Sequence, residues 1–143
     1  MDFNLDRFRK AQAPVMESVR DELAAGHKQS HWMWFIFPQF AGLGRSDMAR
    51  FYAISSLDEA RTYLADPDLG ARLRNMSELV LTHASKSAHA IFGSPDDMKF
   101  HSSMTLFSLV ERERPNVFAD ALLAFYDGKP DRATVQLAGN DNG

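Results

Sequence analysis

Apolar residues recur every three to four positions through most of the chain, which is the spacing of one face of an α-helix. Within residues 14–25, for example, Val15, Val19 and Leu23 share a face, and Gly26 follows as a typical helix terminator. No segment alternates convincingly between apolar and polar residues, as a half-buried strand would. The spacing predicts helices over residues 5–13, 14–25, 46–52, 56–64, 66–83, 94–110 and 115–128, with a shorter apolar turn that ends at residue 93 and a last turn or two over residues 131–137.

Helix start signals agree with this spacing. Ser56 and Glu59 form a capping box of the Ser-x-x-Glu type, and Ser46 is placed to cap a short helix. The clearest signal is Ser-Pro-Asp-Asp at residues 94–97. It combines a capping serine, a proline at the first helical position and two acids where the helix dipole favours them. The helix that follows should reach about Val110.

Residues 31–37 (His-Trp-Met-Trp-Phe-Ile-Phe) form a nearly continuous apolar run, which periodicity alone assigns to neither a strand nor a buried helix. The residue types favour a strand. A lone buried strand, however, would leave its backbone donors and acceptors without partners. We therefore predict a short buried helix that ends near Pro38.

Together these elements predict an all-α fold. We expect one compact domain over residues 1–143, built from seven to nine mostly short helices, with residues 138–143 as a frayed tail. No repeat, linker or low-complexity segment divides the chain. With 143 residues, of which 45% are hydrophobic, the chain is long enough to bury roughly two thirds of its unfolded surface around one core.

Charge and cysteine content narrow the possible functions. Sixteen Lys and Arg against nineteen Asp and Glu give a net charge of −3 without a basic run, so we expect no nucleic-acid partner. The lack of cysteine excludes a disulfide scaffold, a thiolate nucleophile and a cysteine-based metal site, and it favours a cytoplasmic location. No apolar stretch approaches the length of a membrane span, and the polar start is unlike a signal peptide. We expect no membrane partner and predict no cofactor.

Two long motifs carry a family resemblance. The first is Ser-His-Trp-Met-Trp-Phe-Ile-Phe-Pro-Gln at 30–39, which is followed by Gly-Leu-Gly at 42–44, Ser46 and Tyr-Ala-Ile at 52–54. The second begins with Pro-Asp-Asp at 95–97 and continues with Lys99 and Ser-Ser-Met-Thr-Leu-Phe at 102–107. In this order they resemble the signature of the domain-of-unknown-function family eighteen-ten, over about residues 5–137. The resemblance implies a mainly α-helical fold and leaves the biochemical activity open. The name calpastatin, sometimes attached to members of that family, has no support in these residues.

The segment Gly42-Leu43-Gly44-Arg45-Ser46 leads into a predicted helix and is a candidate anion site. Glycines let the backbone approach an anion closely, N–H groups at a helix start point toward it, and arginine binds phosphate or carboxylate through two hydrogen bonds. The segment lacks the third glycine of a dinucleotide fingerprint and is not a Walker loop. The alternative interpretation is a tight turn followed by an ordinary serine cap.

The helix after residue 94 carries polar residues within a largely apolar sequence. Lys99, Ser102 and Ser103 fall on one stripe, and Thr105 adds a further polar side chain. Two interpretations are open. These groups line a cavity that holds a polar ligand, or the serines bond back to the preceding turn while Lys99 reaches solvent or an Asp at the helix start.

The aromatic run offers a flat surface. Trp34 and His31 lie on one side of the predicted helix, where Trp34 is suited to stack on a flat ligand such as a nucleobase. His31 and Gln39, at the ends of the run, can supply hydrogen bonds. The alternative is that these side chains pack in the core. We expect this for at least two of the four aromatic residues of the run, which are Trp32, Trp34, Phe35 and Phe37.

Histidine and serine patterns give neither a metal site nor a catalytic residue. His27 and His31 are four residues apart, but Gly26 argues against a helix that holds both, and no Glu lies between them. Neither a Gly-x-Ser-x-Gly elbow nor a Ser-x-x-Lys pair occurs. We predict no metal, and the question whether the protein is an enzyme stays open.

Two functional hypotheses follow. The first is a small anionic ligand, a nucleotide or phosphorylated metabolite, in a pocket formed by residues 31–39, 42–46 and 99–105. The ligand-binding residues predicted for it are His31, Trp34, Gln39, Gly42, Gly44, Arg45, Ser46, Lys99, Ser102 and Thr105. The alternative is a non-catalytic module that docks a partner protein, or a second copy of the chain, through an aromatic surface patch. It predicts that Trp32 or Phe37 is largely exposed.

Overall fold

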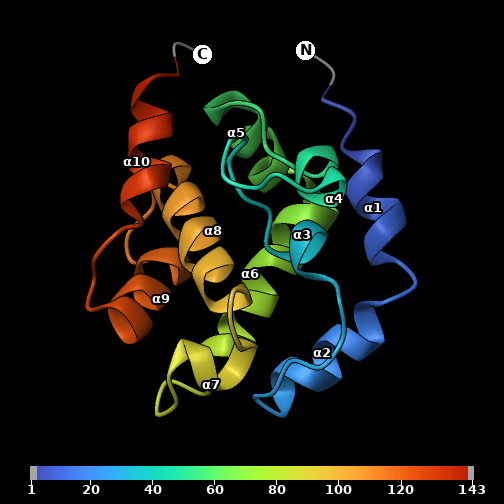
Figure 1. The fold of residues 1–143 in the computed structure, drawn as a ribbon, viewed down its shortest axis with the longest axis vertical. Helices are drawn as coiled ribbons and strands as arrows, with labels where there is room; N and C mark the ends of the chain where they lie inside the picture. Colours follow the sequence, from blue (N-terminus) through green and yellow to red (C-terminus); the bar gives the residue numbers. More distant parts are fainter. Residues whose placement is uncertain (1–2, 142–143) are drawn as a thin grey trace.

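A computed structural model of the chain describes residues 3–141 and confirms the all-α fold (Figure 1). The described residues form ten helices, above the predicted seven to nine, because the short segments that end near residues 93 and 137 both become full helices. In chain order the helices are α1 (Asp6–Gln12), α2 (Met16–Ala24), α3 (Met33–Ile36), α4 (Asp47–Phe51), α5 (Leu57–Ala65), α6 (Pro67–Leu81), α7 (Ala88–Phe92), α8 (Asp96–Val110), α9 (Val117–Tyr126) and α10 (Arg132–Gly139).

Helix α8 forms the centre of the molecule. It packs against α5, α7, α9 and α10, and Figure 1 shows it running between α9 and α10 on one side and the rest of the bundle on the other. Its Phe100, Met104 and Phe107 are completely buried. Each such side chain contributes about 1.5–3 kcal/mol through its burial. This packing fixes the polar residues of α8 relative to the core.

The apolar run forms the short buried helix that the sequence predicts, and this helix, α3, ends at Ile36, before Pro38. Beyond α3 the chain is held by an isolated parallel bridge. The backbone N–H of Ala41 donates to Ile54 O at 2.8 Å, and the Ile54 N–H donates to Gln39 O at 2.9 Å. The loop that leads to α4 is therefore tied to the core.

Most of the predicted start signals are present. Ser46 Oγ accepts the Ala49 N–H at 3.1 Å, and Ser56 Oγ accepts the Glu59 N–H at 3.1 Å. The expected cap at Ser94 is wrong. Helix α8 begins at Asp96, so Pro95 occupies the N-cap position and makes no side-chain cap bond.

The C-terminal helix is longer than predicted. Helix α10 continues to Gly139, and Ala138 is buried, so these two residues belong to the helix and not to a tail. Residues 142 and 143 of the predicted tail lie outside the described residues. In the described part of the chain, no helix combines the length and the hydrophobicity needed to cross a membrane.

Candidate functional site

A cleft of about 430 Å³ lies between the segment that joins α3 to α4 and the first turns of α8 and α10. Figure 1 shows α8 and α10 on one side of this region and α3 and α4 on the other. Its volume lies in the range of small-molecule sites. The cleft is lined by Trp34, Gln39, Leu43, Gly44, Arg45, Ser46, Ala49, Pro95, Met98, Lys99, Ser102, Asp131 and Ala133.

Seven of the ten residues that the sequence singled out line this cleft, namely Trp34, Gln39, Gly44, Arg45, Ser46, Lys99 and Ser102. The other three lie elsewhere. His31 and Gly42 are exposed, and neither borders the cleft. Thr105 is completely buried beneath the start of α10, because it lies on the side of α8 that α10 covers.

The two basic residues of the cleft differ in their surroundings. Arg45 is exposed, and within residues 3–141 its guanidinium makes no hydrogen bond or ion pair. Lys99 Nζ lies 3.4 Å from Asp96 Oδ1 and 5.4 Å from the centre of the Trp34 ring. The same Asp96 carboxylate accepts Lys28 Nζ at 2.7 Å through its other oxygen. One carboxylate thus serves two ammonium groups and leaves a local excess of positive charge.

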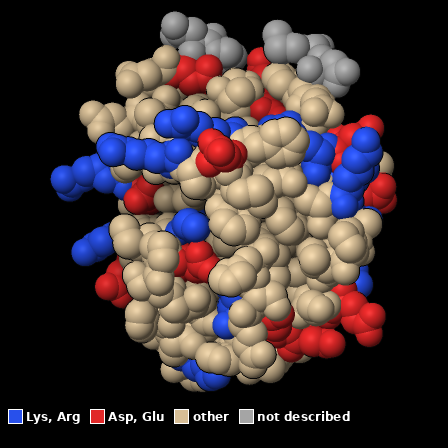
Figure 2. All heavy atoms as spheres, turned by 45° about the vertical axis from the view of Figure 1, so that its right-hand side comes forward, with Lys and Arg blue, Asp and Glu red and all other residues tan. Residues whose placement is uncertain are grey.

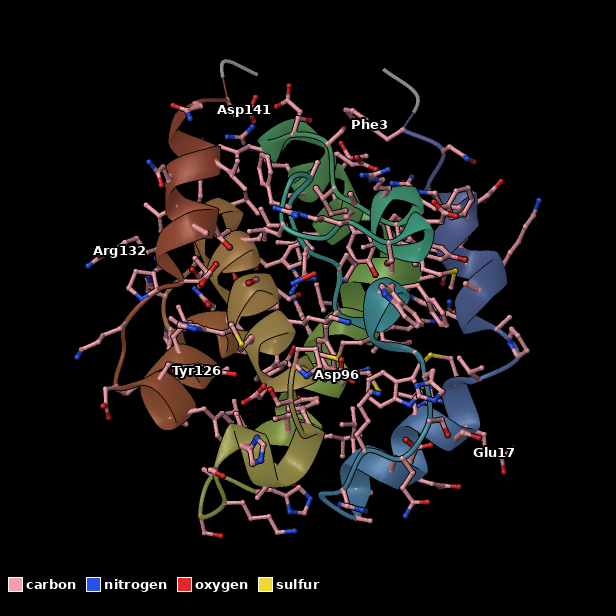
Figure 3. The ribbon with its side chains drawn as sticks, viewed as in Figure 1. Phe3, Glu17, Asp96, Tyr126, Arg132 and Asp141 are labelled. Atoms are coloured by element: carbon pink, nitrogen blue, oxygen red, sulfur yellow. The ribbon has the colours of Figure 1, made fainter. Side chains whose placement is uncertain are left out.

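Asp96 occupies a central position at the start of α8, as Figure 3 shows. The Lys28 side chain beside it is only 5% exposed, and its Nζ also lies 4.9 Å from the centre of the Trp32 ring. Lys28 is therefore a structural partner of Asp96. Lys99, with 26% of its side chain exposed, is the ammonium that a ligand in the cleft can reach.

The backbone of the turn before α4 requires glycine at residues 42 and 44. Gly42 has φ +102°, a conformation that side chains rarely adopt. A Cβ at Gly44 would lie 2.4 Å from the Ala49 Cβ, so the loop needs glycine to pack on α4. Ser46 Oγ is engaged in its cap. Gly42, Gly44 and Ser46 therefore form the tight turn and helix cap of the alternative interpretation. Arg45, which lies within this turn, is the residue whose side chain is left for a ligand.

A hydrogen-bond network joins α8 to α10 at the opposite wall of the cleft. Ser102 Oγ lies 3.1 Å from Asp131 Oδ2 and 3.2 Å from Met98 O, and these two acceptors share its single hydroxyl hydrogen. Asp131 Oδ2 also accepts from Thr134 N at 3.1 Å and from Thr134 Oγ1 at 2.6 Å. Asp131 is thus the N-cap of α10 and, at the same time, a carboxylate of the cleft wall.

Thr105 takes part in the same connection. Its Oγ1 accepts the Asp131 N–H at 2.8 Å and donates to His101 O at 2.9 Å. Its single donor and one of its two acceptor sites are thus used inside the protein. Thr105 therefore connects α8 to the start of α10 and does not line the cleft, contrary to its predicted place in the ligand pocket.

The aromatic residues divide between core and cleft. Trp34 is half-buried at the cleft, whereas Trp32 and Phe37 are completely buried. The expectation that Trp32 or Phe37 is exposed is wrong, since both rings face the core. Gln39 lines the cleft with a carboxamide that makes no hydrogen bond inside the described part of the protein.

No arrangement typical of nucleophilic catalysis is formed at Lys99. Its ammonium pairs with Asp96, and the hydroxyl of Ser102 donates to Asp131. Ser103 Oγ is buried without a partner among the described residues, and it does not border the cleft. Across residues 3–141, no three His, Asp or Glu side chains group in a way that could hold a metal ion.

Sequence reasoning missed six residues of the cleft wall: Leu43, Ala49, Pro95, Met98, Asp131 and Ala133. The most consequential is Asp131, since it adds a carboxylate. Its capping position at the start of the last helix was a local signal, but its proximity to Ser102 depends on how α10 packs on α8.

Comparison with known proteins identifies the family and names no activity for its members. Residues 2–138 match a family described as Protein of unknown function (DUF1810). The chain is similar to the conserved hypothetical protein Rv1873 from Mycobacterium tuberculosis, known from a crystal structure. The two are 49% identical over 96% of this chain and 97% of that chain, with a TM-score of 0.93. No curated protein matches the chain.

Proposed function

The chain belongs to the DUF1810 family, and from its cleft we propose that it binds a small anionic ligand, a nucleotide or another phosphorylated metabolite. The observation that carries this proposal is Arg45. It lines the cleft, it is exposed, and its guanidinium has no partner within residues 3–141. An arginine fork is suited to two parallel hydrogen bonds with phosphate.

Lys99 supports the proposal from the other side of the cleft. Because Asp96 is shared with the buried Lys28, it neutralises the two ammonium groups only in part. These three groups together keep one positive charge, which attracts a phosphate near Lys99. The net charge of the chain is −3, and on the face that Figure 2 shows, Lys and Arg side chains lie across the upper part with Asp and Glu side chains among them.

Trp34 and Gln39 supply the remaining chemistry. The Trp34 ring is half-buried, and Lys99 Nζ approaches it at 5.4 Å from the ring centre. A flat group can stack on such an indole. The carboxamide of Gln39, which makes no hydrogen bond to residues 3–141, offers both a donor and an acceptor. The set fits a ligand that combines a phosphate with a polar organic part.

A thermal-shift screen of nucleotides and sugar phosphates, followed by titration calorimetry, tests this function. The wild type, Arg45→Ala and Lys99→Met are compared, with Arg20→Ala as the matched control, because Arg20 is exposed on α2 and lies outside the cleft. A ligand at about a hundred times its Kd should stabilise the fold by about 2.7 kcal/mol. Each cleft variant should weaken binding about tenfold or more, since a hydrogen bond to a charged group is lost.

The unliganded variants should stay folded. The Arg45 guanidinium makes no hydrogen bond to any described residue, and in Lys99→Met the Asp96 carboxylate keeps its ion pair with Lys28. Binding that survives in both cleft variants, or that Arg20→Ala weakens equally, would show that the ligand lies elsewhere. A panel without any binding would contradict the proposal.

The docking module is not favoured by a specific observation. The rings that the hypothesis placed at the surface, Trp32 and Phe37, are buried, and the large aromatic side chain exposed in the described residues is Phe51. Sedimentation of the purified chain tests association with a second copy directly. A monomer over the whole concentration range would count against association through such a patch.

The proposal includes a cytoplasmic location. The chain carries no cysteine, as is common where thiols stay reduced and disulfides are rare. Nucleotides and sugar phosphates are also metabolites of that compartment. Fractionation of cells that contain the protein should recover it with the cytoplasmic fraction, and recovery with the membrane fraction would contradict this part.

A further inference from the structure

We propose that the ligand carries hydroxyl groups beside its phosphate, as a sugar phosphate does, and that Asp131 is the specificity-determining residue that binds them. This inference rests on the proposed function, because it assigns the second half of the same ligand. It concerns the wall of the cleft formed by α8 and α10, opposite Arg45.

The two carboxylate oxygens of Asp131 are used unequally. Oδ2 accepts from Ser102 Oγ, Thr134 N and Thr134 Oγ1 at 3.1, 3.1 and 2.6 Å. Oδ1 accepts no hydrogen bond from any residue in the described part of the chain. One oxygen therefore caps α10, and the other stays available on a residue that lines the cleft.

The negative charge of this oxygen favours hydroxyl groups of a ligand as its partners. A carboxylate accepts hydrogen bonds and donates none, and it repels a second anion. Asp131 would therefore weaken the binding of inorganic phosphate in this cleft. A ligand with hydroxyl donors turns the same carboxylate into a partner, while Arg45 and Lys99 stay available for its phosphate.

The size of the cleft agrees with a ligand larger than phosphate. At about 30 Å³ for one water molecule, a cleft of about 430 Å³ holds on the order of fourteen groups of that size. Phosphate has five heavy atoms. A pentose phosphate, with fourteen heavy atoms, has room in this volume.

Calorimetric titration with ribose 5-phosphate, inorganic phosphate and O-phosphoethanolamine tests the inference. The proteins are the wild type, Asp131→Asn and, as control, Asp127→Asn. Asparagine caps helices as well as aspartate does, so α10 should persist in Asp131→Asn. Asp127 is exposed outside the cleft and has φ +56°, which asparagine also adopts, so the control makes the same charge change.

We expect the wild type to bind ribose 5-phosphate at least tenfold more tightly than inorganic phosphate. Asp131→Asn should lose about tenfold in affinity for ribose 5-phosphate and lose nothing for inorganic phosphate, since a bond to a charged acceptor disappears while repulsion of the anion is relieved. Asp127→Asn should leave both affinities unchanged.

Other results overturn the inference in distinct ways. Equal wild-type affinities for ribose 5-phosphate and phosphate, or an affinity ratio unchanged by Asp131→Asn, would reduce Asp131 to a helix cap while the anion site stands. Tighter binding of O-phosphoethanolamine than of ribose 5-phosphate would assign the carboxylate to an ammonium group. If none of the three compounds binds, the proposed function fails together with the inference.

Discussion

Replacing Glu22 with glutamine should destabilise the protein at neutral pH and much less in acid. The Glu22 carboxylate holds the chain just before α3. Its Oε1 accepts from Gln29 N at 2.7 Å, Ser30 N at 2.9 Å and Trp32 Nε1 at 3.1 Å, and its Oε2 accepts from Ser30 Oγ at 2.6 Å. Although burial raises the pKa of this carboxyl, the hydrogen bonds led by Ser30 outweigh it and lower the pKa from 4.5 to about 2.

The magnitude follows from this pKa. A carboxylate whose pKa falls from 4.5 to about 2 on folding stabilises the native state by up to about 3 kcal/mol at pH 7. Because Glu22 is partly exposed, solvent screening reduces this to about 2 kcal/mol. The contribution is complete above pH 4.5 and is lost as the pH falls toward 2. Glutamine keeps the geometry and the Oε1 acceptor but lacks the charge.

Urea unfolding at pH 7 and pH 3 measures the effect. The Glu22→Gln variant should be about 2 kcal/mol less stable than the wild type at pH 7, and the difference should shrink by about half at pH 3. The control is Glu17→Gln on the same helix, whose side chain extends into solvent in Figure 3. An equal loss of stability at both pH values would refute the electrostatic reasoning.

Two further predictions concern the core and the turn. Glu59, 2% exposed, pairs with Arg7 at 2.9 Å, so Glu59→Ala should cost about 3–5 kcal/mol in urea unfolding, and a loss below about 1 kcal/mol would show that the pair is not effectively buried. Gly44→Ala should cost about 1–3 kcal/mol, because its Cβ would lie 2.4 Å from the Ala49 Cβ. In a double-mutant cycle with Ala49→Gly, the two substitutions should couple by about 1 kcal/mol, whereas additive effects would contradict the clash.

The helices could be predicted because their signals are local. The caps at Ser46 and Ser56 depend on a residue three positions away, and the chain itself keeps such residues close. The buried helix at residues 33–36 followed from the lack of any strand to pair with it. The error at Ser94 is a shift of one residue in where α8 begins.

The candidate site could be predicted in part. Arg45 and Lys99 were named because each belongs to a motif that mixes polar and apolar residues, and the fold brings both motifs to one cleft. Asp131 could not be named, since its place beside Ser102 depends on packing between α8 and α10. Thr105 was misassigned for the same reason, because only the position of α10 decides which face of α8 is covered.

The most direct test of the anion site is a nitrogen-15 NMR titration of the protein with ribose 5-phosphate and with inorganic phosphate. We expect the largest chemical-shift changes at the backbone amides of Leu43–Ala49 and Met98–Ser102 and at the indole N–H of Trp34. The buried indole N–H of Trp32 should change little. Changes centred on another surface, or none with either compound, would contradict a phosphate-binding cleft.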